Sequence, residues 1–348
     1  TGEHYITRDW PQYRSMLRKA AGGGALTGGT TLLKFMIMGL GLSAFWGGFW
    51  AGAMYAASFV VIQLLHCTLA TKQPAMTAPA MAAKLKDIGT PEAVNAFVDE
   101  VAHLMRSQAA AVLGNVLVVF PVVLLRSVGV GLLLGHPMLS AKDAAYTLHS
   151  LSLLGPTLLF AGFTGCLLFA SSIIAGWVEN WFVLRRLDSA MRYNPSVTGL
   201  LGVERAGRWA HFMRNNISGF ASNISLGFML GLIPPIMAFF SLPLEVRHVT
   251  LSAGQLAAAS VAYGVQTVFM PAFWWAVAAI PLIGALNLGV SFYLAYQLAL
   301  RAHNVSGVQR AHIHQAIWAR WRHRPLSFFI PGGSAHPQAA RTAFRCAP

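Results

Sequence analysis

Seven polar or charged side chains lie within long apolar tracts or at their edges, where they could bind an ion or a polar solute. They are Lys34, Asn115, Arg126, Glu179, Asn180, Asn223 and Asn287. An unpaired charge inside a lipid bilayer costs about 2.5–3.5 kcal/mol on insertion scales, so such a residue should face protein, water or a ligand. We therefore treat these residues as a candidate intramembrane or interfacial polar site.

Each residue also has a structural interpretation, which stays open. Lys34 could instead form a structural ion pair or extend its ammonium group toward the interface. Arg126 lies late in its tract and suits such an extension. Glu179 lies between Trp177 and Trp181, where a structural pair with a nearby arginine competes with a role in proton coupling. The asparagines could bond one helix to another, typically for about 0.6 kcal/mol.

The residues before Lys34 predict which way it points. Gly28, Gly29, Thr30 and Thr31 precede it, and the two threonines lie on its side of a helix. Small and polar residues allow a partner helix to approach closely in lipid. We therefore expect Lys34 to face the interior of a bundle or a water-filled cavity.

The composition identifies lipid as the natural solvent of this chain. Of its 348 residues, 55% are hydrophobic and 10% are charged, whereas an ordinary soluble domain carries about 25% charged residues. The mean hydropathy is +0.55. The three cysteines have no CxxC spacing, and neither a phosphate-binding loop nor a zinc-protease motif occurs. We therefore predict no metal and no cofactor. The sequence shows no recognisable set of catalytic residues, so whether the protein is an enzyme stays open.

The alternation of apolar and polar tracts predicts an all-α polytopic transmembrane helical bundle with cytoplasmic amphipathic helices. We expect the fourth long helix to continue past the membrane as a cytoplasmic arm to about Tyr193. The expected segments are an N-terminal cytoplasmic segment (1–20), a transmembrane hairpin (21–71), a cytoplasmic helical loop (72–108), a second hairpin (109–177), a basic cytoplasmic arm (178–216), a transmembrane region (217–302) and a basic tail (303–348).

The net charge of +14 sets the expected orientation, because arginine and lysine gather on cytoplasmic loops. We therefore expect the protein in the inner membrane of a bacterium. Both the N-terminus and the tail then lie on the cytoplasmic side. Residues 249–300 must cross an odd number of times, so we predict about six spans with a re-entrant piece near 251–270. Simple counting gives seven spans and an external tail as the alternative.

The basic loops should contact anionic lipids. In the tail, Ile313, Ile317 and Trp321 form one stripe surrounded by arginines, which predicts an amphipathic helix on the lipid surface. Within the spans, three glycine pairs of the form GxxxG predict close contacts between helices. They are Gly48 with Gly52, Gly131 with Gly135, and Gly227 with Gly231.

Several long strings resemble a proteobacterial membrane family known as site-specific recombinases. They include "LSLLGPTLLFAGFTGCLLFASSIIAGWVENWFVLRRLDSAMRYNP", "RWAHFMRNNISGFASNISLGFMLGL", "EVRHVTLSAGQLAAA", "NLGVSFYLA" and "TLATKQPAMTAPAMAAKL". The resemblance covers nearly all of the chain to about Pro331. Because members of this family carry a largely helical polar region before this point, and the chain opens at Thr1, we expect a further N-terminal region of the same protein as a partner.

Two functions follow. The polar residues favour transport or envelope maintenance, with a small-molecule or lipid substrate bound between helices. The resemblance implies instead DNA site-specific recombination, or DNA binding through basic cytoplasmic segments. For that activity, His211 and Arg214 match a His-x-x-Arg pattern that could stabilise charge on a scissile phosphate. The downstream tyrosines, Tyr263, Tyr293 and Tyr296, lie in apolar tracts that a duplex should not reach.

Overall fold

The computed structural model describes residues 6–69, 91–302 and 307–331, and every regular element in these residues is a helix. Five of the helices are long and apolar enough to cross a membrane. They are α2 (Ala44–Leu64), α4 (Pro91–Leu134), α6 (Thr157–Leu184), α9 (Val203–Phe239) and α11 (Pro271–Ala302). The predicted all-α bundle of long apolar helices is therefore confirmed.

Helix α1 (Trp10–Gly39) is also long but is not among these five. Its start is capped by Asp9, whose carboxylate accepts a hydrogen bond of 2.8 Å from the N–H of Gln12. Its middle buries small residues instead of leucines, among them Gly23, Gly24 and Gly28. Because these glycines have no side chain, α1 lies directly against α4, and a methyl group added to Gly24 would meet the carbonyl oxygen of Asn115 at 2.5 Å.

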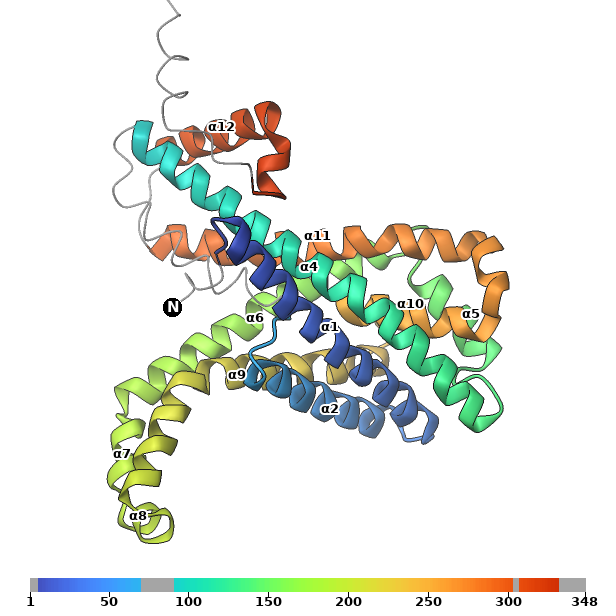
Figure 1. The fold of residues 1–348 in the computed structure, drawn as a ribbon, viewed down its shortest axis with the longest axis horizontal. Coiled ribbons are helices and arrows are strands. Elements are labelled where there is room, and N and C mark those ends of the chain that lie inside the picture. The colour runs from blue at the N-terminus through green and yellow to red at the C-terminus, as the bar shows by residue number, and fades with distance from the viewer. Residues whose placement is uncertain (1–5, 70–90, 303–306, 332–348) are drawn as a thin grey trace, which may run out of the picture.

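The long helices pack in three pairs, α1 with α4, α2 with α9, and α6 with α11 (Figure 1). Within the first and third pairs the two helices run in the same direction, whereas α2 and α9 are antiparallel. The main hydrophobic core lies where α4, α6 and α11 surround α10 (Val249–Tyr263) and α5 (Ala141–Ser150). Polar groups inside this bundle therefore have to find their partners on neighbouring helices.

Helix α4 is one continuous helix of 44 residues. The sequence predicts a separate cytoplasmic helix up to residue 108 and a membrane span from 109, and the structure joins the two. No glycine or proline occurs between Glu92 and Leu113. Since nothing in this stretch interrupts helical hydrogen bonding, the amphipathic part and the apolar part continue into each other.

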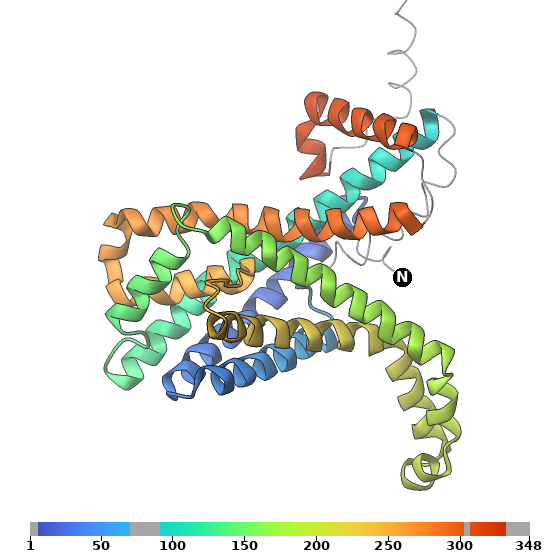
Figure 2. The same ribbon diagram turned by 180° about the vertical axis from the view of Figure 1, so that it is seen from behind.

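The prediction that the fourth long helix continues to Tyr193 is wrong. Helix α6 ends at Leu184, and Arg186 adopts a left-handed backbone conformation with φ of 49°. The chain then forms α7 (Leu187–Tyr193) and α8 (Pro195–Leu201) before α9 begins. The end of α6, α7, α8 and the first part of α9 together project from the bundle, and we call residues 178–216 the arm (Figures 1 and 2).

A short helix precedes the last long helix, in the region where the sequence predicts a re-entrant piece. After α9 the chain is irregular from 242 to 248, and α10 then starts inside the bundle. All residues from Val249 to Gly254 are buried. The 3-10 helix η4 (Gly264–Phe269) connects α10 to α11. How α10 relates to a membrane stays a prediction.

Two of the three glycine pairs meet each other. Gly48 and Gly52 of α2 face Gly227 and Gly231 of α9, so the two backbones are in direct contact. A methyl group on Gly231 would lie 2.3 Å from the backbone nitrogen of Gly52. The third pair, Gly131 and Gly135, lies at the end of α4 and makes no contact between helices. Small residues thus predict close packing where both partner helices carry them.

The termini of the described chain lie at the same end of the bundle as the start of α4 (Figure 2). There, α12 (Gly307–His323) and the 3-10 helix η5 (Pro325–Phe328) pack onto the first part of α4. Ile313 is buried in a cluster with Phe97 and Val101, and Ile317 packs against the same cluster. The stripe predicted to lie on lipid therefore faces protein, apart from its partly exposed member Trp321.

We expect Gly231→Ala to lower the free energy of unfolding by about 1–3 kcal/mol, because its methyl group overpacks the contact with α2. Gly47→Ala is the matched control, since a methyl group on Gly47 meets nothing within 4 Å. Thermal unfolding of both purified variants in one detergent measures the difference. Equal melting temperatures for the two variants would contradict the direct contact between α2 and α9.

Candidate functional site

The segment that leads into α10 brings charged groups into the bundle. Arg247 is buried, and its Nη2 atom lies 2.5 Å from Oε2 of Glu245 and 3.0 Å from the carbonyl oxygen of Ser150 at the end of α5. The backbone N–H of Arg247 donates to Oγ1 of Thr164 in α6 at 2.7 Å. The guanidinium group is thus held by α5 and by its own loop, next to the start of α10.

Tyr146 of α5 completes this group of residues. Its hydroxyl donates to Oε1 of Glu245 at 2.8 Å. Partial burial raises the pKa of the Tyr146 phenol, and the hydrogen bond to Glu245 raises it further. The phenol therefore keeps its proton at neutral pH and remains a donor to the carboxylate.

Asn287 of α11 fixes the first turn of α10. Its Oδ1 accepts from the N–H of Val249 at 3.0 Å, and its Nδ2 donates to the carbonyl oxygens of Ala161 and Arg247, each at 2.9 Å. The side chain is fully buried. Because helix starts leave N–H groups without partners inside the helix, an apolar bundle can hold such a start only where a side chain supplies the acceptor.

Asn115 of α4 makes a similar set of bonds on the other side of α10. Its Nδ2 donates to the carbonyl oxygens of Ala20 and Thr68, both at 2.9 Å, and its Oδ1 accepts from the hydroxyl of Thr250 at 3.2 Å. One buried amide thus joins α1, the end of the first hairpin, α4 and α10. Both asparagines act as the helix-to-helix bonds that the sequence left as one interpretation.

Lys34 lies near this charged loop. It is half-buried on α1 and close enough to Glu245 and Arg247 for both charges to act on it. One turn earlier, Thr31 touches Gly254 of α10, where a methyl group would meet Oγ1 of Thr31 at 2.5 Å. Within the described residues Lys34 forms no hydrogen bond or ion pair. Lys34 is thus within the electrostatic range of Glu245 and Arg247 without contacting either, and we call the three residues the charged triad.

The other predicted site residues are not part of this arrangement. Arg126 is exposed on α4, with its guanidinium group beside Gly29 of α1, and Asn180 is exposed on α6. Glu179 is half-buried and has no ion pair in the described part of the chain. Asn223 is buried between α9 and α2, where its Nδ2 donates to Oε1 of Gln63 at 2.6 Å. The structure therefore brings Asn115 and Asn287 to the first turn of α10, with Lys34 on a later turn of α1, and leaves the remaining four elsewhere.

The recombinase-like pair also remains separate from any tyrosine nucleophile. His211 is exposed on the arm and bonds to Asn215, while Arg214 forms an ion pair of 3.2 Å with Asp188. Tyr263 donates its hydroxyl proton to the carbonyl oxygen of Ala141 in α5. Tyr293 and Tyr296 lie on α11, and Tyr296 stacks on Phe292 and Phe97. Tyr263, Tyr293 and Tyr296 therefore lie on elements other than the arm that carries His211 and Arg214.

Sequence reasoning missed the buried group that Glu245 forms with Arg247 and Tyr146, and its charges near Lys34. From the sequence alone, "EVRH" at residues 245–248 is expected to be a short charged loop outside the membrane. The available signal was its position directly before 52 residues without a charge, from Val249 to Leu300. Such a loop can fold into the bundle as well as lie outside it, because the apolar tract that follows is too long for one span.

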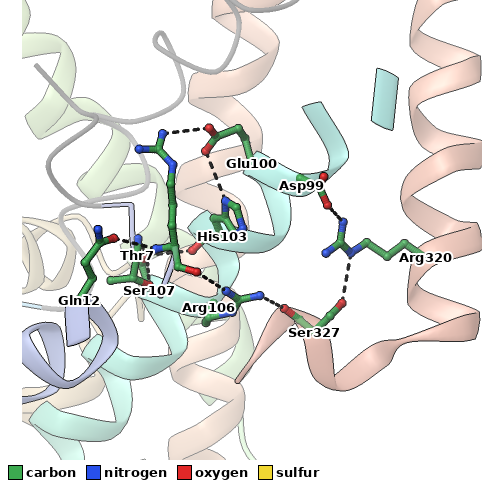
Figure 3. A network of polar contacts seen from close by, with 10 residues as sticks. Thr7, Gln12, Asp99, Glu100, His103, Arg106, Ser107, Arg320 and Ser327 are labelled. Atoms are coloured by element: carbon green, nitrogen blue, oxygen red, sulfur yellow. Dashed lines mark hydrogen bonds and ion pairs between the residues drawn. The ribbon is translucent and has the colours of Figure 1, made fainter. Parts of the chain in front are cut away.

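A second polar network ties together three distant parts of the chain at the opposite end of the bundle (Figure 3). Thr7 and Ser107 are hydrogen-bonded, Arg8 pairs with Glu100 at 2.9 Å, and Arg320 pairs with Asp99. The buried Arg106 donates to the carbonyl oxygens of Arg8 and Ser327, the latter at 2.8 Å. This network holds the first residues and the tail on α4, which is a structural role.

Comparison with known families gives one match. A family model described as "Site-specific recombinase" matches residues 1–331. No curated protein and no solved structure matches the chain significantly. The match covers the charged triad, both buried asparagines and the arm.

We expect Asn287→Ala to destabilise the protein by about 3 kcal/mol, because it leaves the N–H of Val249 and two carbonyl groups buried without this partner. Asn180→Ala, which removes an exposed amide, should change stability by less than about 0.5 kcal/mol. Thermal unfolding in detergent compares the two. If the two variants have the same melting temperature, Asn287 does not hold the start of α10.

Proposed function

The chain belongs to the site-specific recombinase family, and we propose that it is an integral protein of the bacterial inner membrane that binds an anionic substrate group at the charged triad. Its activity is then transport or envelope maintenance, with a small molecule or a lipid as the substrate. The observation that carries this proposal is a lysine without an ion pair, Lys34, in the electrostatic range of the charged loop before α10.

The charge balance of the triad supports an anionic ligand. Glu245 neutralises Arg247 through a direct ion pair, whereas Lys34 has no carboxylate within hydrogen-bonding distance among the described residues. A lone ammonium group is costly in an apolar bundle. A carboxylate or phosphate group of a substrate would supply the missing negative charge.

A helix that starts inside the bundle also favours this location. In membrane transporters, substrates bind near interrupted helices, whose N-terminal ends carry partial positive charge. Here α10 starts beside Arg247 and is surrounded by α4, α5 and α11. The likeness to transporters is an analogy of architecture, and the charges of the triad provide the chemical argument.

The proposed orientation has six crossings, formed by α1, α2, α4, α6, α9 and α11, with α10 re-entrant. Placing the arm, the first residues and the tail in the cytoplasm agrees with their arginines. The end that carries α5 and η4 then faces the periplasm. In this orientation the triad lies toward the periplasmic side, under α5.

DNA recombination is the second candidate, because the family description names it. It would use the arm, which carries His211 and Arg214. Against it stands the separation of this pair from Tyr263, Tyr293 and Tyr296. A recombinase would need a nucleophile that a DNA strand can reach.

We expect Lys34→Met to abolish function while leaving membrane insertion and melting temperature nearly unchanged. Function is measured in cells without the chromosomal copy, as the entry of a dye that an intact envelope excludes. Arg126→Met is the matched control, because it also removes a cation from a long helix but lies outside the triad. The control should restore the barrier as well as the natural chain does.

Two results would contradict the proposal. One is full function of Lys34→Met at the same abundance in the membrane. The other is strand exchange by the purified protein on duplex DNA that disappears in folded His211→Ala and Arg214→Ala variants. The second result would support recombination in place of transport.

A further inference from the structure

The arm, residues 178–216, buries only Phe182, Ala206 and Ala210. No residue of α7 or α8 is buried, and both helices lean on the first part of α9. Apolar side chains at its surface are unusually open, with Leu184 82% exposed, Leu200 85% and Val203 67%. Tryptophans and other aromatic residues are exposed beside them. A surface of this kind needs a partner that accepts apolar groups.

The charge of the arm specifies that partner further. Residues 178–216 contain six arginines, Arg185, Arg186, Arg192, Arg205, Arg208 and Arg214, against the three acids Glu179, Asp188 and Glu204. Of these six arginines, only Arg214 forms an ion pair within the described residues, with Asp188. The other arginines keep their guanidinium groups available for a negatively charged partner.

The position of the arm places it beside a bilayer. It extends α6 and α9, two helices apolar enough to cross a membrane. Both views show it bending away from the long direction of the bundle (Figures 1 and 2). It therefore runs alongside the face of the membrane on which α6 ends. Exposed Trp177 and Trp181, near the end of α6, are typical of the membrane–water interface.

We propose that the arm lies on the bilayer surface and binds anionic phospholipids, with its arginines on lipid phosphates and Leu200 and Val203 in the headgroup region. Basic amphipathic segments bind anionic lipid through this combination of charge and apolar area. The phosphates of DNA would also bind the arginines, but DNA would leave Leu200 and Val203 in water, since protein–DNA interfaces are polar. The inference depends on membrane location but not on a substrate at the charged triad.

The test uses the full chain in nanodiscs, with Cys67, Cys166 and Cys346 replaced by serine and a polarity-sensitive fluorophore on Leu200→Cys. One set contains phosphatidylcholine alone, and the other contains 30% phosphatidylglycerol, a composition of about one anionic lipid in three. We expect the fluorophore to shift to the blue and to resist an aqueous quencher in the anionic set. The double variant Arg205→Gln with Arg208→Gln should weaken the binding of the arm to anionic lipid about fivefold for each arginine, the equivalent of about 1 kcal/mol per arginine.

The matched control replaces two cations away from the arm, Arg126→Gln with Lys142→Gln, and should leave the signal unchanged. A fluorophore that stays equally open to quencher in both lipid compositions would overturn the proposal. So would shielding by duplex DNA in phosphatidylcholine nanodiscs without any effect of phosphatidylglycerol, which would assign the arm to nucleic acid. This test does not depend on whether the Lys34→Met variant loses function.

Discussion

A helix that begins inside an apolar bundle must find acceptors for its first N–H groups there, and this requirement organises the centre of the protein. Asn287 accepts from Val249 while holding the carbonyl groups of Ala161 and Arg247. Because these bonds come from α11 and reach α6, they fix where α10 starts. The charged loop before α10 is then placed against α5 and α6, where its charges act on Lys34 of α1.

Close contact between backbones provides the second condition. Polar side chains such as Asn115 can span from helix to helix only if the helices are near one another. Gly23 and Gly24 bring α1 to Asn115, while Gly227 and Gly231 bring α9 to α2. In lipid, where apolar surface gains little from association, such packing and internal hydrogen bonds stabilise the bundle. Small residues and buried amides thus act together.

Much of this fold could be predicted from the sequence, because apolar tracts of about 20 residues report membrane-length helices directly. The sequence predicts the positions of α4, α9 and α11. It also predicts that Asn115 and Asn287 lie between helices. The break at Arg186 was not, since Leu184 to Tyr193 contains no glycine or proline to mark it. The approach of Lys34 to the charges of Glu245 and Arg247 could not be predicted either, because these residues are more than 200 positions apart and leave no local pattern.

The central claim is that α10 enters the bundle and returns without crossing the membrane. Reporters active only in the periplasm test it directly when fused in the turn after Val265 and after Arg324 of the tail. The account predicts a strong signal from the first fusion and silence from the second. A strong signal from the fusion after Arg324 would mean that the tail lies outside and that the chain crosses seven times, which would contradict the account.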